Sequence, residues 1–551
     1  MRTVLTLTAL ALLAASAFAG NANFEARLDG SLVGVGSDAG WSAALEGDVA
    51  VVGAPGEGAA YVFEKQAGVW VEKTRLQASL TTPGDRFGEA VALRGGVIVV
   101  GAPDSTAGSG MTSGAAFVFR KLGAVWTEVD VLSHPSPGFN DDFGSAVSTD
   151  GDRIIVGAPF TPGTGFLQGA AYIFDDPVTS DDFSDVTPVI SADIADLDFY
   201  GRGVDIEGDV AAVGADLDDD NGDASGSVYV FRFGGGGWAE EDKLKPADGA
   251  ALDQFGLFID FDGNRLAVSS TAADIGGVQD AGAIYTFLYA GGVWSQEDKV
   301  VSSAPITNGQ FGSDLALDGS LMIAGEAVSS SSAPVAGTVH EVRLSAGTWT
   351  DVSDTTANGG TLGDWFGFAL DLDGAVFVGG APRDALLGND AGTAFVQGFG
   401  ERFPTVCVGD GTLTSCPCGN NSTLGNGEGC RNSQGLGAVL AANGSASVAT
   451  DDLVFAVDQA RPGAPGIFIQ GTVLVTIPFK DGILCMGNPT ERLEVIFLSA
   501  TGTGNSAESV VSNCNVLPGQ TRYYQFWYRD PQVSPCGTGS NFTNGLTVDW
   551  Q

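Results

Sequence analysis

Residues 85–103 read DRFGEAVALRGGVIVVGAP, a stretch in which glycines separate short apolar runs. Gly88 is followed by Gly95 after seven residues and by Gly101 after six more. The spacing recurs along the chain, with a first glycine at 40, 88, 144, 201, 256, 312 and 367. A second glycine follows each after seven residues, and a third after six more in every copy except the fifth, which has Ser269. The stretch is therefore one unit of a sevenfold repeat about 50 residues long.

Each repeat continues with a second pair of segments rich in Val, Phe and Tyr, such as GAAYVF at 58–63 and VWVEKTRL at 69–76. Short runs of this composition between Gly-rich turns indicate β-strands. Four strands in each of seven repeats predict an all-β, seven-bladed β-propeller over residues 23–400. The middle glycine of each repeat falls in a tight hairpin turn that requires a positive φ.

The start of this region predicts how the ring closes. Residues 23–31 (NFEARLDGS) are similar to the outer strands that precede later repeats, whereas the seventh repeat ends after its third strand. We therefore expect the strand at 23–30 to complete the seventh blade.

These motifs resemble the FG-GAP repeats of integrin α-subunit propellers and their secreted bacterial relatives. Phe-Gly or Tyr-Gly occurs at 87–88, 143–144, 200–201, 255–256, 311–312 and 366–367, and Gly-Ala-Pro at 53–55, 101–103, 157–159 and 380–382. In integrin-type repeats the first hairpin is often enlarged into a calcium-binding Asp-x-Asp-x-Asp-Gly loop. The hairpins here have two residues, too few to surround a Ca²⁺ ion that needs six to eight oxygen ligands, so we do not expect calcium there.

The two faces of the predicted propeller differ in their loops. Turns between the first and second and between the third and fourth strands are short. Loops on the opposite face are long and varied, such as 104–114 (DSTAGSGMTSG) and 160–169 (FTPGTGFLQG). Because function on rigid scaffolds concentrates in such loops, the sequence predicts that a ligand binds this face, without identifying the ligand.

The loop at 214–226 (GADLDDDNGDASG) is the most acidic of these loops. Clustered carboxylates repel one another unless they are neutralised, and Ca²⁺ prefers oxygen ligands. The candidate calcium ligands are Asp216, Asp218, Asp220 and Asp223. The alternative is a solvated loop whose Asp and Asn side chains form turns.

Three further patterns each have a structural and a functional interpretation. An aspartate three residues before the first glycine, at 85, 141, 198, 253 and 364, either caps the turn, which we favour, or lines a cation-attracting rim. Tryptophans 70, 126, 238, 294 and 349 either pack between blades, which we favour, or stack on sugars. His134 and His340 lie in different repeats and unlike contexts, so we expect ordinary surface or strand residues rather than a catalytic or zinc site.

The N-terminus and the charge bear on location and partners. Residues 1–19 have the form of a secretory signal peptide that ends in Ala17-Phe18-Ala19, and no later apolar run is long enough for a membrane anchor. The formal net charge of −42 argues against nucleic acid as a partner. We expect a secreted, extracellular or cell-surface protein.

The region 404–551 holds all seven cysteines, which marks a domain boundary near residue 400. Disulfides are expected in an exported protein, with one cysteine left over and with Cys416 and Cys418 bonded elsewhere rather than to each other. Alternating strands with Gly and Pro turns predict a disulfide-stapled, antiparallel β-sandwich-like domain. In the strand at 522–529 (RYYQFWYR), one face carries Tyr523, Gln525, Trp527 and Arg529, and the other carries Tyr524, Phe526 and Tyr528. Either one face meets a glycan by aromatic stacking, or this is a core strand with one buried face, which we favour.

Two functions remain open from the sequence. The favoured hypothesis is a non-catalytic binding or adhesion protein that uses the long loops to bind an extracellular protein or polysaccharide. The alternative is a secreted carbohydrate-active or other hydrolytic enzyme that uses Asp and Glu carboxylates, as glycosidases do. With 67 acidic residues, the sequence nominates no catalytic pair.

Overall fold

The computed structural model describes residues 22–551 except 67, 83, 164, 176–182, 328–336, 346, 358–362, 400–402, 404, 412–413, 423–427, 444–445, 447, 449–450, 452, 500–501, 515, 532–535 and 551. The fold is all-β as predicted, with 52% of residues in strands and 1% in a helix. The chain separates into two compact units, residues 1–398 (unit 1) and 399–551 (unit 2), which are described separately. The expected signal segment at 1–19 lies outside the described residues. Along the described part of the chain, no helix is long and apolar enough to span a membrane.

The described strands of unit 1 form seven four-stranded sheets, numbered in chain order. Sheets 1 to 3 consist of β2 (Ser42–Glu46), β3 (Val49–Ala54), β4 (Ala59–Gln66) and β5 (Val69–Leu76); β6 (Val91–Arg94), β7 (Val97–Ala102), β8 (Ala115–Leu122) and β9 (Val125–Ser133); and β10 (Ala146–Thr149), β11 (Arg153–Ala158), β12 (Ala170–Asp175) and β13 (Asp185–Pro188). Sheets 4 to 6 consist of β14 (Val204–Glu207), β15 (Val210–Ala215), β16 (Ser227–Gly234) and β17 (Gly237–Leu244); β18 (Phe255–Asp262), β19 (Arg265–Ser270), β20 (Ala283–Ala290) and β21 (Val293–Val300); and β22 (Leu315–Asp318), β23 (Leu321–Glu326), β24 (Thr338–Ser345) and β25 (Thr348–Thr355). Sheet 7 consists of β26 (Leu370–Asp373), β27 (Val376–Ala381), β28 (Thr393–Phe399) and the N-terminal β1 (Ala22–Leu28).

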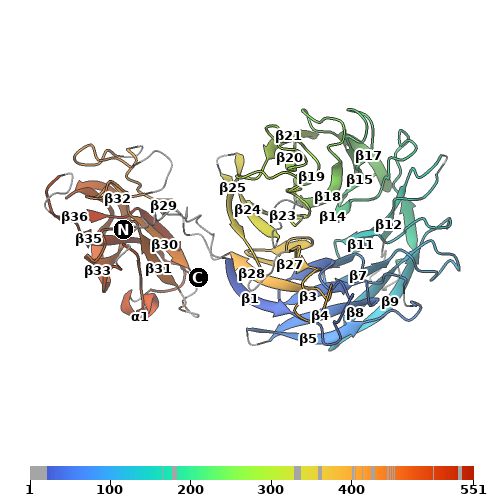
Figure 1. Cartoon of the computed structure of the whole chain (residues 1–551), viewed down its shortest axis with the longest axis horizontal. Helices are drawn as coiled ribbons and strands as arrows, with labels where there is room; N and C mark the ends of the chain where they lie inside the picture. Colours follow the sequence, from blue (N-terminus) through green and yellow to red (C-terminus); the bar gives the residue numbers. More distant parts are fainter. Residues whose placement is uncertain are drawn as a thin grey trace, which may run out of the picture. The chain divides into compact units, whose positions relative to one another are not determined.

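The sheets are arranged like the blades of a propeller (Figure 1). The first strand of each repeat is the inner strand, and the inner strands contact one another in the order β2, β6, β10, β14, β18, β22, β26 and back to β2. Hydrophobic clusters fill the space between neighbouring sheets. One of them combines Val51 and Val62 of sheet 1 with Phe87 and Phe117 of repeat 2. The propeller-like architecture predicted from the repeats is thereby confirmed.

Close backbone contact between neighbouring sheets explains the third glycine of the repeat. A Cβ atom at Gly101 would clash with the carbonyl oxygen of Gly144, the first glycine of the next repeat. The same clash would occur between Gly380 of the last repeat and Gly40 of the first. The middle glycine has the predicted positive φ, which is 60° at Gly95. The middle glycine of the motif therefore permits the hairpin turn, and the third glycine permits the close approach of neighbouring sheets.

A circle of carboxylates joins the inner hairpins of neighbouring sheets, and sequence analysis missed it. In six of the seven repeats the residue before the middle glycine is acidic, and its side chain accepts the backbone N–H of the middle glycine in the next repeat, at 2.5 to 3.1 Å. The pairs are Glu46 with Gly95, Asp150 with Gly208, Glu207 with Gly263, Asp262 with Gly319, Asp318 with Gly374, and Asp373 with Gly47. The seventh repeat is thus bonded to the first.

The N-terminal strand completes the last sheet, as predicted: β1 is hydrogen-bonded beside β28. Arg27 at the end of β1 donates two hydrogen bonds to Asp384, of 2.7 and 2.9 Å, and a third to Asp29 of 2.8 Å. The Arg27 and Asp384 side chains are only 17% and 5% exposed. Two ends of unit 1 that are far apart in sequence are therefore joined by a shielded, bidentate ion pair.

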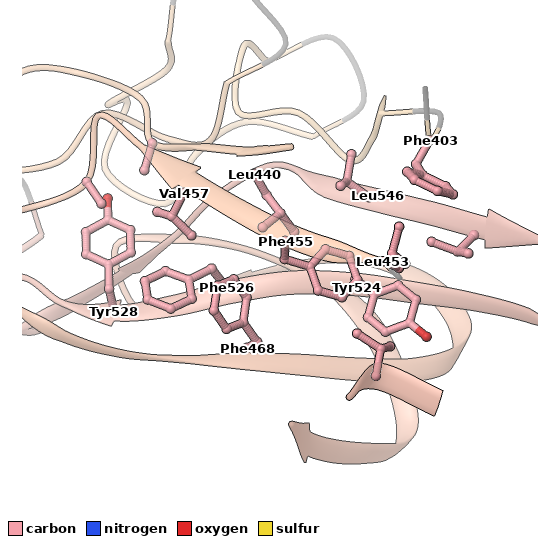
Figure 2. Packing of buried hydrophobic residues seen from close by; sticks show 14 of the residues in the cluster. Phe403, Leu440, Leu453, Phe455, Val457, Phe468, Tyr524, Phe526, Tyr528 and Leu546 are labelled. Atoms are coloured by element: carbon pink, nitrogen blue, oxygen red, sulfur yellow. The ribbon is translucent and has the colours of Figure 1, made fainter. Parts of the chain in front are cut away.

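Unit 2 contains two sheets that share one core. The larger has the order β29 (Thr405–Val406), β37 (Gly545–Asp549), β35 (Thr521–Arg529), β32 (Pro465–Phe479) and β33 (Gly482–Phe497), with β36 (Ser540–Phe542) beside β35; the smaller has β30 (Val439–Asn443), β31 (Val454–Asp458) and β34 (Gly504–Asn505). The helix α1 spans Val510–Cys514. Figure 2 shows Leu440, Phe455 and Val457 of the smaller sheet packed with Phe468 and the face of β35 that carries Tyr524, Phe526 and Tyr528. The core interpretation of this strand is confirmed.

Three disulfides connect segments of unit 2, and one of them reaches Cys485 within β33. They join Cys407 to Cys485, Cys416 to Cys430, and Cys418 to Cys536. The expectation that Cys416 and Cys418 bond to other cysteines is therefore confirmed. The remaining cysteine, Cys514, ends α1, and its side chain lies outside the described part.

The closure of sheet 7 by Arg27 is testable. Arg27→Ala removes a bidentate hydrogen bond to a carboxylate, and we expect it to lower the free energy of unfolding of unit 1 by about 2 kcal/mol. The matched control is Lys299→Ala, which breaks a pair with Asp248 in which the two side chains are 29% and 55% exposed. Exposed pairs contribute about 0–1 kcal/mol. Calorimetry of both variants decides, and equal losses would contradict the role given to Arg27.

Candidate functional site

A turn of the same shape precedes the first glycine of every repeat, and we call it the FG turn. In repeats 2 to 5 an aspartate three residues before the glycine accepts a backbone N–H from three residues further back, and in repeat 1 the hydroxyl of Ser37 does so. Repeat 6 has Gly309 at this position. The bonds are Thr82 to Asp85 (2.9 Å), Ala250 to Asp253 (2.8 Å) and Ala195 to Asp198 (2.5 Å), with Gly138 to Asp141 of the same kind. These aspartates are buried. The expectation that they cap the turn is confirmed.

The FG turns hold non-glycine residues in the left-handed backbone region. Two residues before the first glycine, φ lies between 51° and 62° in all seven repeats, at Asp38, Arg86, Asp142, Phe199, Gln254, Gln310 and Trp365. Such residues are uncommon and concentrate at functional sites. Their backbone conformation is the same in all seven repeats, with or without the capping aspartate, while their side chains differ from repeat to repeat.

These turns surround one end of a cavity of about 680 Å³ that is lined by the inner strands. Its lining at this end includes Trp41, Arg86, Asp142, Arg202 and Phe368. We call this end the cavity mouth. It opens on the face of the long loops, where the sequence predicted binding.

Two aromatic groups lie at the cavity mouth. In the first, the rings of Trp41 and Phe368 are 4.8 Å apart, Trp365 stacks on Phe368 at 5.7 Å, and the guanidinium of Arg383 lies 4.7 Å from the Trp365 ring. Trp41, Trp365 and Phe368 are partly exposed.

The second group lies in repeats 3 and 4. There the ring of Phe160 is 5.2 Å from that of Phe199, and Arg202 lies over Phe199 at 5.8 Å. Partly exposed aromatic rings beside cations are suited to bind flat apolar or polar groups by stacking.

A charged cluster lies between these aromatic groups. Arg86 is 2.6 Å from Asp104, 3.0 Å from Glu89 and 3.8 Å from Asp142. Burial raises the pKa of Asp142 to about 6, although Arg86 opposes the shift. One arginine therefore bridges repeats 2 and 3 and faces three carboxylates.

Four aspartates lie deeper, among the inner strands: Asp205, Asp260, Asp314 and Asp371. Each accepts a backbone N–H from the next inner strand, for example Leu45 to Asp371 at 2.6 Å and Leu370 to Asp314 at 2.7 Å. Burial raises the pKa of Asp314 and of Asp371 to about 7, and that of Asp205 to about 6. Burial and the Asp205 charge also raise the pKa of Asp260. The carboxylate oxygens of these four aspartates accept hydrogen bonds that join neighbouring sheets.

The predicted calcium ligands are divided between different cations of the chain. Lys243 Nζ lies 2.9 Å from Asp218 and 2.8 Å from Asp220, whereas Asp216 is bound to Arg202 at 2.9 Å. Burial lowers the pKa of Lys243, but hydrogen bonds to Asp220, Asp218 and Asp193 outweigh it and raise the pKa overall. Asp223 is exposed. Within the described ranges, no three acidic, His or Cys side chains are grouped as metal ligands would be. Calcium at this loop stays a prediction.

Both histidines are buried, so the surface interpretation is wrong for them. His340 in β24 lies between two carboxylates, 3.0 Å from Glu326 and 3.3 Å from Asp351. Burial lowers its pKa, but these hydrogen bonds outweigh burial and raise the pKa to about 9.

His134 follows β9 and contacts the hydroxyls of Tyr172 and Thr161 at 3.0 and 3.2 Å. Burial lowers its pKa. His340 is thus held within its own sheet, whereas His134, at the end of sheet 2, is held by residues of repeat 3.

The recurrent tryptophans pack between sheets, as expected. Trp126, Trp294 and Trp349 are buried in clusters that join neighbouring sheets. Each donates its indole N–H to a carboxylate of the preceding sheet, namely Glu64, Glu241 and Glu297, at 3.1 to 3.4 Å. Trp70 and Trp238 are partly buried. They are not the candidate ligand platforms.

The candidate site lies on the face where the sequence favoured binding, but its residues were not named from the sequence. Two positions of the repeat could have identified them: the position two residues before the first glycine and the position one residue after it. These positions carry Arg86 and Glu89 in repeat 2 and Trp365 and Phe368 in repeat 7. A site that recognises a specific ligand needs different side chains at the equivalent positions of the repeats, and these two positions provide them.

The buried aspartates give stability a defined pH dependence. A carboxyl whose pKa is higher in the folded than in the unfolded chain stabilises most at low pH, and this contribution is lost as pH rises through the folded pKa. With pKa values of about 7, Asp314 and Asp371 should each raise stability by up to about 1.4 kcal/mol per pH unit as pH falls from 7 to 5. Calorimetry from pH 8 to 5 should show this slope reduced in Asp371→Asn, which retains one acceptor oxygen. Asp219→Asn, at an exposed position, should leave the slope unchanged.

Comparison with known proteins follows this geometry. The FG-GAP repeat family matches residues 70–119, 126–174, 183–231 and 238–287. Each match runs from the outer strand of one sheet to the third strand of the next, so it includes the contact between sheets. No curated protein matches the chain. The chain thus carries four FG-GAP repeats within residues 70–287, and the propeller-like arrangement of the sheets fits an FG-GAP repeat β-propeller.

Proposed function

We propose that this chain is a secreted, non-catalytic binding or adhesion protein whose cavity mouth and surrounding loops bind an extracellular protein or polysaccharide. The observation that carries the proposal is the mouth itself, where partly exposed aromatic rings and the Arg86 cluster surround one end of a cavity. FG-GAP propellers often bind protein ligands and are typically non-catalytic. Secretion is supported by the three disulfides, which are usual in oxidising compartments.

The proposal includes a closed seven-bladed ring and a sandwich-like second domain. The ring is supported by the seven sheets and by the contact of β26 with β2. A sandwich is supported by the core that the two sheets of unit 2 share. A closed ring would hold the seven FG turns at fixed distances around the mouth, which a binding site for a large ligand requires.

The binding function is tested with arrays of glycans and extracellular-matrix proteins probed by the full chain. Trp41→Ala with Phe368→Ala removes the first aromatic group, and we expect bound signal to fall about tenfold or more, as for hot-spot aromatics. The control is Leu122→Ser at an exposed hairpin position on the opposite face. Equal signals from both variants would contradict the proposal.

The alternative, a hydrolase that uses carboxylates, is tested on the same samples. Asp142 has the raised pKa and the position at the mouth that an acid catalyst would need. Polysaccharide or ester turnover that Asp142→Asn or another single carboxylate substitution abolishes would replace the binding proposal by the enzymatic one.

Calcium at Asp216, Asp218, Asp220 and Asp223 is a separate proposal, supported by five aspartates in one loop. A Ca²⁺ ion there would have to displace Lys243 from Asp218 and Asp220. The expected result is a modest rise of the thermal midpoint with millimolar calcium, which Asp218→Asn with Asp220→Asn abolishes. No calcium-dependent shift in the native chain would rule the site out.

A further inference from the structure

The FG turns contain a second position with a positive φ, and at this position two repeats carry a different kind of residue from the other five. Four residues before the first glycine, φ is positive in every repeat, at Gly36, Gly84, Asn140, Leu197, Leu252, Asn308 and Gly363. Glycine and asparagine adopt this conformation readily, whereas leucine is strained in it. Repeats 4 and 5 therefore have strained leucines where their neighbours have residues suited to the turn.

The two leucines remain largely exposed, so burial offsets little of this strain. Leu197 is 48% and Leu252 is 61% exposed. At the position two residues before the glycine, by contrast, Phe199 and Trp365 pack against other rings. A strained, exposed, apolar side chain is best explained by a role outside the folded chain itself.

Two exposed phenylalanines lie in the adjoining loops of the same face. Leu197 donates its backbone N–H to the carbonyl of Phe166 at 3.0 Å, and Phe166 is 62% exposed. Phe139, 75% exposed, immediately precedes Asn140, which occupies the left-handed position of repeat 3. We call Phe139, Phe166, Leu197 and Leu252 the apolar loop patch. Three consecutive FG turns and one adjoining loop supply it.

Carboxylates surround the patch. The loops that carry or adjoin it, residues 134–144, 159–169, 190–201, 215–226 and 245–256, contain 12 Asp and one Lys. Five of these Asp form ion pairs with Arg202, Lys243, Lys245 or Lys299. Asp196 accepts the backbone N–H of Phe166 at 2.9 Å, and the carbonyl of Asp223 accepts that of Leu252 at 2.8 Å. Asp196, Asp219 and Asp223 are exposed. An apolar centre with an acidic rim is complementary to an apolar surface with a basic rim.

We propose that the apolar loop patch docks a polypeptide in which Leu- or Phe-like side chains are flanked by Lys or Arg. The inference rests on the proposed binding function and assigns the chemistry of a protein partner. A second copy of this chain carries the same net charge of −42 and is repelled. Anionic lipid is repelled for the same reason.

The test uses three labelled synthetic peptides and fluorescence anisotropy with the full chain at 150 mM salt. One alternates Lys with Leu and Phe, the second has Ser in place of Leu and Phe, and the third has Glu in place of Lys. We expect the first to bind about tenfold or more tightly than the other two, a difference within the range of a few apolar contacts.

The decisive variant is Leu197→Gly with Leu252→Gly. Glycine suits a positive φ, so the thermal midpoint should stay the same or rise while the preference for the first peptide is lost. Leu122→Ser, on the opposite face, should retain the preference. A preference that persists in the double variant, or a lower midpoint, would overturn the proposal, because the leucines would then be dispensable for docking or needed for folding.

Two further outcomes separate related ideas. Equal binding of the Lys-Leu-Phe and Lys-Ser peptides would show attraction by charge alone and overturn the patch. Binding of phosphatidylcholine vesicles that the double variant loses, without any peptide preference, would assign the patch to a membrane and overturn a protein partner. The Leu197→Gly, Leu252→Gly variant is then compared on the arrays with the Trp41→Ala, Phe368→Ala variant. If the leucine variant retains every ligand that the aromatic variant loses, the apolar loop patch is not a docking site, and the proposed binding function stands.

Discussion

The exposed edge of each inner strand is the constraint on which the rest of unit 1 depends. An inner strand pairs with one neighbour in its own sheet, so backbone N–H groups on its other edge need acceptors from elsewhere. Carboxylates of the preceding sheet supply them, through Asp371 to Leu45 and Asp373 to Gly47 at the junction of the last sheet with the first. A carboxylate suits this task because it accepts hydrogen bonds at both oxygens and donates none when ionised. Part of the acidity of the chain therefore has a structural cause.

The same arrangement accounts for the electrostatics of the cavity. Bringing Asp205, Asp260, Asp314 and Asp371 together removes each from water and places like charges near one another, and both effects favour the protonated form. The circle is interrupted where Arg94 precedes the middle glycine of repeat 2. Repeats 2 and 3 are linked instead at the mouth, where Arg86 reaches Asp142. Repeat 2 thus has Arg94 at one end of its inner strand, where the carboxylate circle is interrupted, and Arg86 near the other end, where it pairs with Asp142 of repeat 3.

Sequence analysis predicted those features that a single repeat contains. Glycine spacing and the Phe-Gly pairs lie within one unit, and comparing units was enough to predict the strands and the pairing of β1. The carboxylate circle was missed because five of its bonds join residues 49 to 58 positions apart, as Glu46 and Gly95 do, and the sixth, Asp373 to Gly47, joins residues 326 positions apart. The sequence motif around Gly95 is also explained by a hairpin. The loop at 214–226 shows the same limit. Its aspartates are adjacent in sequence, but Lys243, which lies between two of them, belongs to a strand two segments later.

The FG turn also explains why the motif identifies the scaffold and leaves the ligand open. The same positive φ values recur in all seven FG turns, including repeats 1 and 6, which lack the aspartate cap, so the backbone is held whatever residues these positions carry. A left-handed conformation costs a non-glycine residue about 1–2 kcal/mol, and the cap and the contacts between sheets offset this cost. Side chains as different as Arg86, Phe199 and Trp365 therefore share one backbone geometry. In such a scaffold the residues that differ between repeats determine which partner is bound. A residue with a strained backbone and an exposed side chain, such as Leu197 or Leu252, contributes little to packing, and this distinguishes it from a residue that stabilises the fold.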